Sequence, residues 1–369
     1  MNSEKIIRKF GARDEDIDSL LAYNKRRFDH SNFDKGSLFP ISEELSVRAW
    51  RRYVDEAKKK GSYPTLRSTI IQLNFPIKKG ISKSDEYVKA TTEGLLSKGA
   101  EGIGLESVEF YIAKTPVGGI PIIVTKKRGD FEKLIGAISH KNEPEKIPAS
   151  MGAATFSGYN NWERINGYKK AFIDRGFNEY EWASELQNLT KKKELYKDSF
   201  IILSGGPYSS ISHQELGLDE ESWLDISLEI RKYHELTHYF TKRALGAMSN
   251  NALDEILCDY VGIVGATDKF NEKWLLKFLG LESFPKYREG GRLQNYVGKE
   301  ISKEGFVVLQ KLVHESIGKI KSFHSSSYNG NVFQMVMALS YFTLEELAVV
   351  EIEEIAKKLE GVVKRWKEN

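Results

Sequence analysis

The sequence predicts an α+β protein in which a small mixed sheet precedes a largely helical C-terminal lobe. Short β-prone runs lie in the first 204 residues, whereas apolar residues spaced three and four apart dominate after residue 218. Hydrophobic residues make up 40% and charged residues 29% of the 369-residue chain, so the chain can bury a sizeable core. We expect three regions, namely a mainly helical part over 1–100, an α+β upper lobe over 101–218 and a helical lobe over 219–369.

The N-terminal region is expected to consist mainly of helices. Residues 14–28 and 42–60 combine mixed charges with spaced apolar side chains, as surface helices do. Residues 85–98 are expected to form a further helix. The run STIIQLNF at 68–75 is predicted to be a strand, because it is rich in β-prone residues and is followed by Pro76.

The middle region is expected to supply the other strands. The runs 108–113 and 120–124 flank the turn-forming sequence TPVGG, which predicts a β-hairpin. Residues 200–203 form another predicted strand, which stops at a Ser-Gly-Gly sequence. The stretch 144–161 is rich in Gly, Ala, Ser and Pro and is expected to be a long ordered loop. Further helices are predicted over 130–139, 162–174 and 179–196.

The C-terminal region has the clearest helix signals. A helix is predicted over 219–243, because Asp219 can cap its first turn and basic residues suit its last turn. Residues 303–320 are expected to form an amphipathic helix, followed by a polar loop over 322–331. Thr343 begins a sequence with capping-box spacing, after which we expect one long amphipathic helix.

Composition restricts the partners and the location. The net charge of +3 is too small to predict a nucleic-acid or membrane-surface partner. No apolar run approaches the ~20 residues of a transmembrane helix, and the N-terminal sequence has no apolar secretory segment, so we expect a cytoplasmic location. Cys258 is the only cysteine, which excludes an internal disulfide and Cys-rich zinc motifs. The sequence does not indicate the oligomeric state.

The sequence HELTH at 234–238 carries a pattern suited to a metal ion. His234 and His238 lie four residues apart in a predicted helix, so they face the same side, one turn apart. Two imidazoles in this arrangement can bind one tetrahedral Zn²⁺ at N–metal distances near ~2 Å. A catalytic zinc generally takes three protein ligands and leaves one position for water, so a third ligand must come from another part of the chain.

The sequence LDEILCD at 253–259 can supply the third ligand. On a helical projection its apolar residues share one face, and Glu255 and Asp259 fall on the opposite face together with Gly262 and Ala266. Two carboxylates beside two small residues favour a helix laid closely against another helix that presents cations or a metal. We therefore expect this face to meet the histidine helix.

HELTH followed by a helix with DEILCD resembles the thermolysin-type zinc metallopeptidases, the gluzincins, whose pattern is HExxH and then a downstream Glu with an Asp four residues later. The resemblance covers only about residues 219–266. It implies a zincin-like catalytic core that hydrolyses peptide bonds, with Glu235 as general base and Asp259 as hydrogen-bond acceptor of the first histidine ligand. The single Zn²⁺ of each chain would be bound by His234, His238 and Glu255.

The same resemblance implies two further features. A His, Tyr or Arg of the C-terminal half would stabilise the oxyanion. An edge strand that precedes the histidine helix would pair with a bound peptide, and residues 200–204 are its candidate. The partner of the protein would then be a peptide or protein substrate. The oxyanion candidates are His324, Tyr328, Tyr287 and Arg288.

Other interpretations of these residues stay open. The two histidines can be partly buried core residues without a metal. Glu255 can instead form an ion pair with Arg231 or Arg243, and Asp254 or Asp259 can take its place as the ligand. For the whole protein, the alternative to a metallopeptidase is a non-catalytic zinc-binding regulatory or structural module that retains the same constellation.

Overall fold

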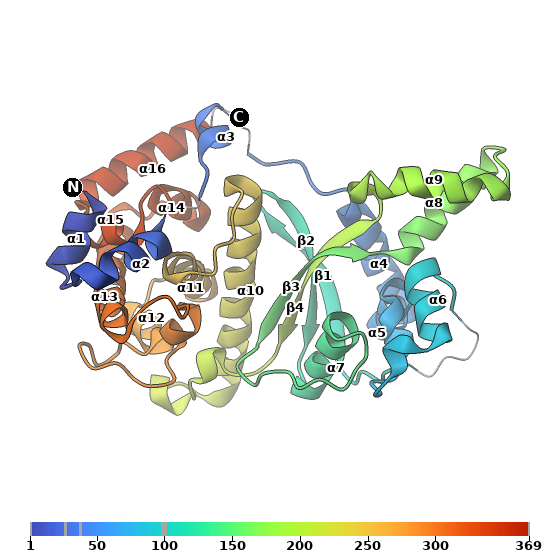
Figure 1. The fold of residues 1–369 in the computed structure, drawn as a ribbon, viewed down its shortest axis with the longest axis horizontal. Helices are drawn as coiled ribbons and strands as arrows, with labels where there is room; N and C mark the ends of the chain where they lie inside the picture. Colours follow the sequence, from blue (N-terminus) through green and yellow to red (C-terminus); the bar gives the residue numbers. More distant parts are fainter. Residues whose placement is uncertain (1, 26–27, 37–38, 97–101, 368–369) are drawn as a thin grey trace. The chain divides into compact units, whose positions relative to one another are not determined.

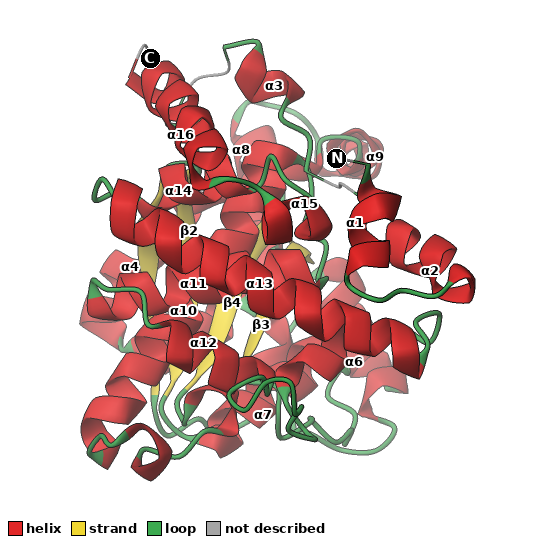
Figure 2. Ribbon diagram, turned by 90° about the vertical axis from the view of Figure 1, so that its left-hand side faces the viewer, coloured by secondary structure: helices red, strands yellow, loops and turns green. Residues whose placement is uncertain are grey.

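The computed structural model describes residues 2–25, 28–36, 39–96 and 102–367. Its architecture is α+β, with a small mixed sheet of four strands and a helical C-terminal part, as predicted (Figure 1). Helices predominate over the four strands (Figure 2).

The chain divides into two compact units. Unit 1 comprises Met1–Ile41 and Pro207–Asn369, and unit 2 comprises Ser42–Gly206, so unit 2 is inserted into the sequence of unit 1. The unit boundaries fall after residues 41 and 206, whereas the regions expected from the sequence end at residues 100 and 218.

Unit 2 contains the sheet, in which the strand order is β1-β2-β4-β3. β1 and β2 form an antiparallel hairpin with Thr115 opposite Gly118, which confirms the predicted hairpin. β2 pairs with β4 in parallel, and β3 pairs with β4 in antiparallel fashion, so the sheet is mixed. The strands are β1 (Val108–Thr115), β2 (Gly118–Thr125), β3 (Ala153–Asn160) and β4 (Lys197–Ser204).

Residues 200–204 are predicted to be an edge strand, and this prediction is wrong about their position in the sheet. This segment belongs to β4, as a strand was expected here, but β4 lies between β2 and β3. The reason is β3, which lies within 144–161, the stretch predicted to be a loop. The small residues of β3 give no regular apolar alternation, so its pairing with β4 could not be read from side-chain pattern.

The helices of unit 2 confirm most of the helical predictions for this region, but the strand predicted at 68–75 is wrong. That run contains the end of α5 and a 3₁₀ turn, η1 (Ile71–Asn74). Ile70 and Leu73 are fully buried in the core of unit 2, and a short apolar run suits a buried helical turn as well as a strand. Residues 97–98 of the predicted helix 85–98 lie outside the described residues. The helices are α4 (Ser46–Lys60), α5 (Ser62–Thr69), α6 (Asp85–Glu93), α7 (Arg128–Ser139), α8 (Trp162–Asp174) and α9 (Trp182–Thr190).

The regular secondary structure of unit 1 in the described residues consists of helices joined by turns and loops. Two of its N-terminal helices pack on its C-terminal part, α1 against α15 and α2 against α13. The helix predicted over 14–28 is α2, and residues 26–27 of that prediction lie outside the described residues. The helices are α1 (Ser3–Lys9), α2 (Asp14–Asn24), α3 (Ser31–Asp34), α10 (Glu220–Leu245), α11 (Ala252–Thr267), α12 (Glu272–Leu279), α13 (Lys303–Ser327), α14 (Val332–Leu339), α15 (Leu344–Val349) and α16 (Ile352–Lys367).

Two C-terminal predictions need correction. The capping box at Thr343 is present, but α15 ends at Val349, and the extended backbone of Val350 separates it from α16. One long helix was expected, and two form. The polar loop predicted over 322–331 begins later, because α13 continues to Ser327. Serine-rich composition favoured a loop there, whereas the packing of Phe323 in the core favours the extra helical turn.

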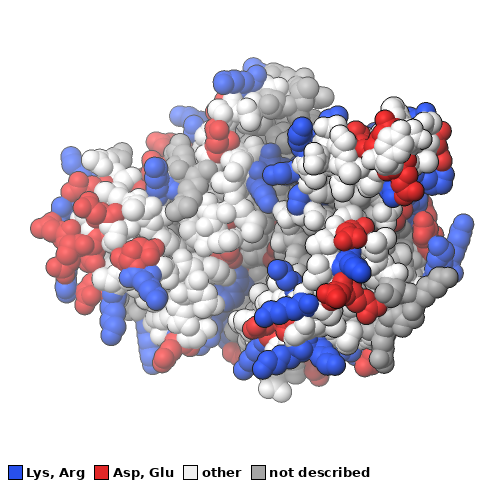
Figure 3. All heavy atoms as spheres, turned by 45° about the vertical axis from the view of Figure 1, so that its right-hand side comes forward, with Lys and Arg blue, Asp and Glu red and all other residues white. Residues whose placement is uncertain are grey.

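The surface agrees with a nearly balanced charge. Basic and acidic side chains are interspersed on the face drawn in Figure 3. Among the described residues, no helix has both the length and the apolar character needed to cross a bilayer.

Candidate metal centre

Two adjacent helices of unit 1, α10 and α11, carry the candidate ligands. Asp219 caps α10 by accepting a hydrogen bond from the backbone N of Ser222 at 2.9 Å, as the sequence predicted. The two helices approach closely where Gly262 of α11 faces α10. A Cβ atom at Gly262 would lie 2.9 Å from the carbonyl oxygen of Ile230. The small-residue face predicted for α11 therefore does meet the histidine helix.

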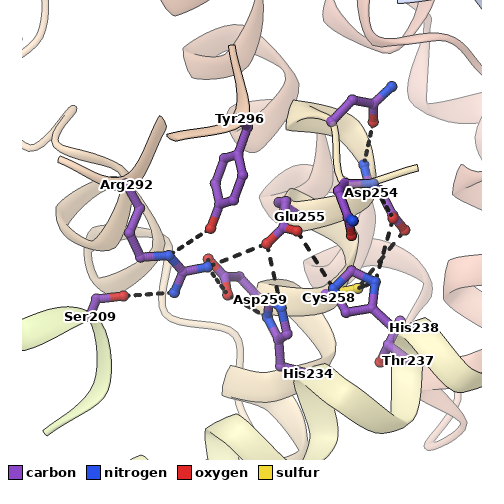
Figure 4. A network of polar contacts seen from close by, with 12 residues as sticks. Ser209, His234, Thr237, His238, Asp254, Glu255, Cys258, Asp259, Arg292 and Tyr296 are labelled. Atoms are coloured by element: carbon purple, nitrogen blue, oxygen red, sulfur yellow. Dashed lines mark hydrogen bonds and ion pairs between the residues drawn. The ribbon is translucent and has the colours of Figure 1, made fainter. Parts of the chain in front are cut away.

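The two histidines lie one turn apart on α10 and are buried. His234 is 7% and His238 4% exposed. Their ring centroids are 4.9 Å apart, and both rings lie beside the acidic residues of α11 (Figure 4). The four-residue spacing of HELTH thus produces the paired arrangement that a metal site requires.

Glu255 of α11 faces the Nε2 atoms of both histidines. Its Oε2 lies 3.4 Å from Nε2 of His234, and its Oε1 lies 3.5 Å from Nε2 of His238. Both separations exceed the ~2.7–3.2 Å of an N–H···O hydrogen bond. Atoms bonded to one tetrahedral ion at about 2.0–2.1 Å lie about 3.3–3.4 Å apart. Each carboxylate oxygen of Glu255 therefore faces one histidine nitrogen at a separation close to that between neighbouring ligands of one ion.

Asp259, one turn beyond Glu255, holds the other ring nitrogen of His234. Its Oδ1 lies 2.8 Å from His234 Nδ1 and accepts a hydrogen bond from the hydroxyl of Tyr208 at 2.6 Å. The guanidinium of Arg292 donates to both of its oxygens at 3.1 and 3.2 Å. A neutral His234 with its Nδ1–H directed at Asp259 would carry its lone pair on Nε2, toward Glu255.

His238 has a different carboxylate at its Nδ1. Oδ2 of Asp254 lies 3.4 Å from this nitrogen, and Sγ of Cys258 also lies 3.4 Å from it. Asp254 is in turn fixed by the backbone N–H groups of Ser249 and Asn250, which donate to Oδ2 at 2.8 and 3.0 Å. The loop between α10 and α11 therefore orients the acid that faces His238.

Arg292 and Tyr296, from the 3₁₀ turn η7 (Arg292–Tyr296), complete the polar network (Figure 4). Nη2 of Arg292 lies 3.6 Å from Oε2 of Glu255, which gives this carboxylate an arginine partner other than the two that the sequence suggested. Nη1 of Arg292 donates to Ser209 Oγ, and its Nε donates to the Tyr296 hydroxyl, each at 2.7 Å.

The donor atoms of His234, His238 and Cys258 all lie within 4.8 Å of one another, so this group can also hold a metal ion. Cys258 approaches His238 from Nδ1, however, while Glu255 approaches both rings from Nε2. An imidazole directs its two nitrogens to opposite sides, so the thiol and Glu255 occupy different positions around His238. Complete burial raises the pKa of Cys258 well above its ordinary value.

The protonation of the centre follows from its contacts. Burial lowers the pKa of His234 and His238. Asp259 and Glu255 outweigh burial at His234, and Cys258, Asp254 and Glu255 outweigh it at His238, so both pKa values are raised. Burial raises the pKa of Glu255 and Asp259, but the neighbouring histidines and, at Asp259, Arg292 outweigh burial and lower both pKa values. The carboxylates are therefore ionised, and they favour a cation at the ring nitrogens.

The remaining predicted residues are Glu235 and the four oxyanion candidates. Glu235 sits between the two histidines on α10 and is partly exposed. His324 is in the last turn of α13, where its Nδ1 lies 2.9 Å from the hydroxyl of Tyr260 and its ring stacks on Tyr328. Tyr287 and Arg288 lie between α12 and η7, where their side chains donate to backbone carbonyl oxygens.

The comparisons with known proteins identify a family without a described function. The family of unknown function DUF7005 matches residues 5–351. The chain belongs to this family. No curated protein and no solved structure matches the DUF7005 chain.

Sequence reasoning missed four members of the network, namely Tyr208, Ser209, Arg292 and Tyr296. Each lies in a short turn far from HELTH in sequence, where no periodic pattern marks it. Arg292 is four residues beyond Arg288, one of the predicted oxyanion candidates. Asp254 was considered as an alternative ligand, and the structure places it instead at Nδ1 of His238.

Proposed function

We propose that this protein is a zinc-dependent metallopeptidase with a zincin-like core, in which His234, His238 and Glu255 hold one Zn²⁺ per chain. The observation that carries the proposal is the pair of Nε2–carboxylate separations, 3.4 and 3.5 Å, which suit a shared ion better than direct hydrogen bonds. The separate carboxylates at the two Nδ1 atoms support it, because such partners are typical of zinc-binding histidines.

Glu255 is preferred to Cys258 as the third ligand. It faces the same nitrogen of both rings, whereas Cys258 and Asp254 share the opposite nitrogen of His238. Two histidines and a glutamate are also the ligand set of known catalytic zinc sites that keep a position open for water.

The reaction follows from the chemistry that such a site supports. A bound zinc ion supplies a Lewis acid that lowers the pKa of water to about 7 and polarises a peptide carbonyl. Glu235, partly exposed beside His234, would take a proton from the attacking water and deliver it to the leaving amine. Tyr296, which is partly exposed and within 2.7 Å of Arg292, joins the four predicted residues as a candidate hydrogen-bond donor to the oxyanion.

Elemental analysis combined with a protease assay tests the proposal. We expect the purified protein to contain one equivalent of zinc and to hydrolyse a denatured protein mixture. Glu235→Gln should retain stoichiometric zinc and lose hydrolysis by at least 100-fold, in line with the roughly 10²–10⁴-fold contribution of a general base. His238→Ala should lose the zinc itself. Full hydrolysis by Glu235→Gln would remove Glu235 from the mechanism.

The alternative is a non-catalytic zinc-binding module, and one observation favours it. The three proposed ligands are only 4–7% exposed, and closed sites are typical of structural zinc. Stoichiometric zinc in a wild-type protein that cleaves no member of a peptide library would support the module over the peptidase.

A further inference from the structure

The buried residue Tyr208 connects the candidate metal centre to the start of the second segment of unit 1, which begins at Pro207. Tyr208 follows Pro207 directly and is 5% exposed. Its hydroxyl donates to Asp259 Oδ1 at 2.6 Å and lies 3.0 Å from His234 Nδ1, so one phenol touches both the first histidine and its carboxylate.

The segment around Tyr208, which we call the boundary segment (residues 207–211), has a backbone that depends on its contacts. Ser209 and Ser210 have φ values of 53° and 58°, in the left-handed region that residues other than glycine rarely adopt. This conformation persists only where surrounding contacts hold it. Such a segment responds to the loss of an anchor more readily than a regular helix does.

Several hydrogen bonds anchor the boundary segment, among them one from Arg231 to the carbonyl oxygen of Pro207 at 3.4 Å, and two of the others end in the network of Asp259. Tyr208 N donates to the hydroxyl of Ser227 at 3.0 Å, and the indole of Trp223 donates to the carbonyl oxygen of Ile211 at 2.8 Å. The two anchors in the network of Asp259 are the Tyr208 hydroxyl on Asp259 and the Arg292 guanidinium, which donates to Ser209 Oγ at 2.7 Å. Since Arg292 itself donates to Asp259, both of these anchors depend on one carboxylate.

We propose that Tyr208 is a positioning residue of the metal centre, and that it couples metal binding at His234 to ordering of the boundary segment. The inference rests on the metal site proposed above. The phenol donates to Asp259, and Asp259 fixes the Nδ1–H of His234, which leaves Nε2 free for the metal. A metal that immobilises His234 therefore immobilises Asp259 and the boundary segment. By linkage, a segment that is ordered in advance strengthens metal binding by the same factor.

Zinc titration of Tyr208→Phe tests the coupling. This variant removes one hydroxyl and keeps the ring packed. We expect the zinc Kd, measured by competition with a chromophoric chelator, to rise about 10–100-fold, the usual effect of removing an outer partner of a metal ligand. The matched control is Tyr159→Phe in unit 2, which loses two hydrogen bonds of a partly buried tyrosine and should leave the zinc Kd unchanged.

Hydrogen exchange distinguishes a positioning role of Tyr208 from a purely structural one, because only the positioning role predicts protection that depends on zinc. In wild type, saturating zinc should slow exchange of the Tyr208 and Ile211 amides, whose N–H groups are hydrogen-bonded. In Tyr208→Phe the zinc-induced protection of these two amides should disappear, while that of α10 and α11 remains. If Tyr208→Phe does not fold, Ser209→Ala tests the parallel anchor, and it should reduce the same protection.

A double-mutant cycle identifies the route of the effect. If Tyr208 acts through Asp259, the losses in zinc affinity of Tyr208→Phe and Asp259→Asn should be strongly non-additive. Zinc binding by wild type with no change in the boundary segment, or an unchanged Kd for Tyr208→Phe, would overturn the coupling and leave the metal site standing. A wild-type protein that binds no zinc at His234 would overturn both.

Discussion

His234 and His238 present the same nitrogen to Glu255, but the partners behind them differ. His234 has an ionised Asp259 with three donors around it, from Tyr208, Arg292 and the ring itself. His238 has Asp254 and a thiol at 3.4 Å. A fully partnered carboxylate fixes a ring more firmly than one at a longer distance. The first histidine is therefore the more rigid donor of the pair.

The choice between Glu255 and Cys258 as third ligand can be decided by two substitutions. Glu255→Gln keeps the size of the side chain and removes the charge that faces both Nε2 atoms. Its zinc Kd should rise by more than the roughly 10–100-fold that outer contacts contribute. Cys258→Ala removes the thiol at Nδ1 of His238 and leaves Asp254 there, so its Kd should change by less than about 10-fold. Competition with a chelator measures both values.

The opposite ranking would contradict the proposed ligand set. If Cys258→Ala loses zinc and Glu255→Gln retains it, the ion lies on the Nδ1 side of His238. In that case the group of two histidines and a cysteine is the site.

Sequence reasoning succeeded for residues whose spacing is set by a single helix. HELTH and the Glu255–Asp259 pair each place two groups on one helical face, and their meeting followed from the small-residue face of the second helix. It failed for Tyr208 and Arg292, which reach the centre from isolated turns. Their positions depend on tertiary packing, so a single sequence contains no periodic signal for them.

At the scale of elements, the centre depends on how closely α11 lies against α10. Gly262 permits this approach, and it stands on the same face as Glu255 and Asp259, so any separation of the helices at Gly262 also moves the carboxylates away from the histidines. A Cβ at this position would meet a backbone carbonyl at 2.9 Å, which cannot rotate away. The packing of two helices is therefore part of the metal-site geometry.

Gly262→Ala should lower both stability and metal affinity. We expect overpacking to lower the free energy of unfolding by about 1–3 kcal/mol. The better helix propensity of alanine offsets part of this loss. The matched control is Gly318→Ala in α13, where a Cβ meets nothing within 4 Å. That variant should be more stable by about 0.5–1 kcal/mol, because alanine is the better helix former. Urea denaturation measures both. A Gly262→Ala protein as stable as Gly318→Ala would contradict the tight contact.

Element types were predicted best where capping and amphipathic spacing agreed. Asp219 and the capping box at Thr343 both form as expected. Two of the errors fall on 68–75, where an apolar run became helical, and on β3, where a run rich in Gly, Ala, Ser and Pro became a strand. In both cases the deciding interactions are non-local. Ile70 and Leu73 pack into the core of unit 2, and β3 is held by its ladder with β4.

At the scale of the whole molecule, the described ligands and partners of the candidate centre all belong to unit 1, while unit 2 has a core of its own. That core includes Trp50, Phe131 and Phe200, all fully buried. It is bordered by a polar network in which Asp198 accepts hydrogen bonds from the Trp50 indole at 2.8 Å and from Asn161 at 2.6 Å. A segment with its own sheet, core and satisfied buried carboxylate meets the usual requirements for independent folding.

We therefore predict that residues 42–206 fold when expressed alone. The fragment should give mixed α/β far-UV circular dichroism and a single cooperative thermal transition, because its sheet and core are built from within the segment. It should bind no zinc at the site proposed here, since every proposed ligand lies outside it. Trp50→Ala in the fragment should remove about 3–5 kcal/mol of stability, because it empties the centre of the core and leaves Asp198 without one donor. A fragment without a cooperative transition, or one whose stability does not change with the Trp50→Ala substitution, would mean that the fold of unit 2 depends on the rest of the chain.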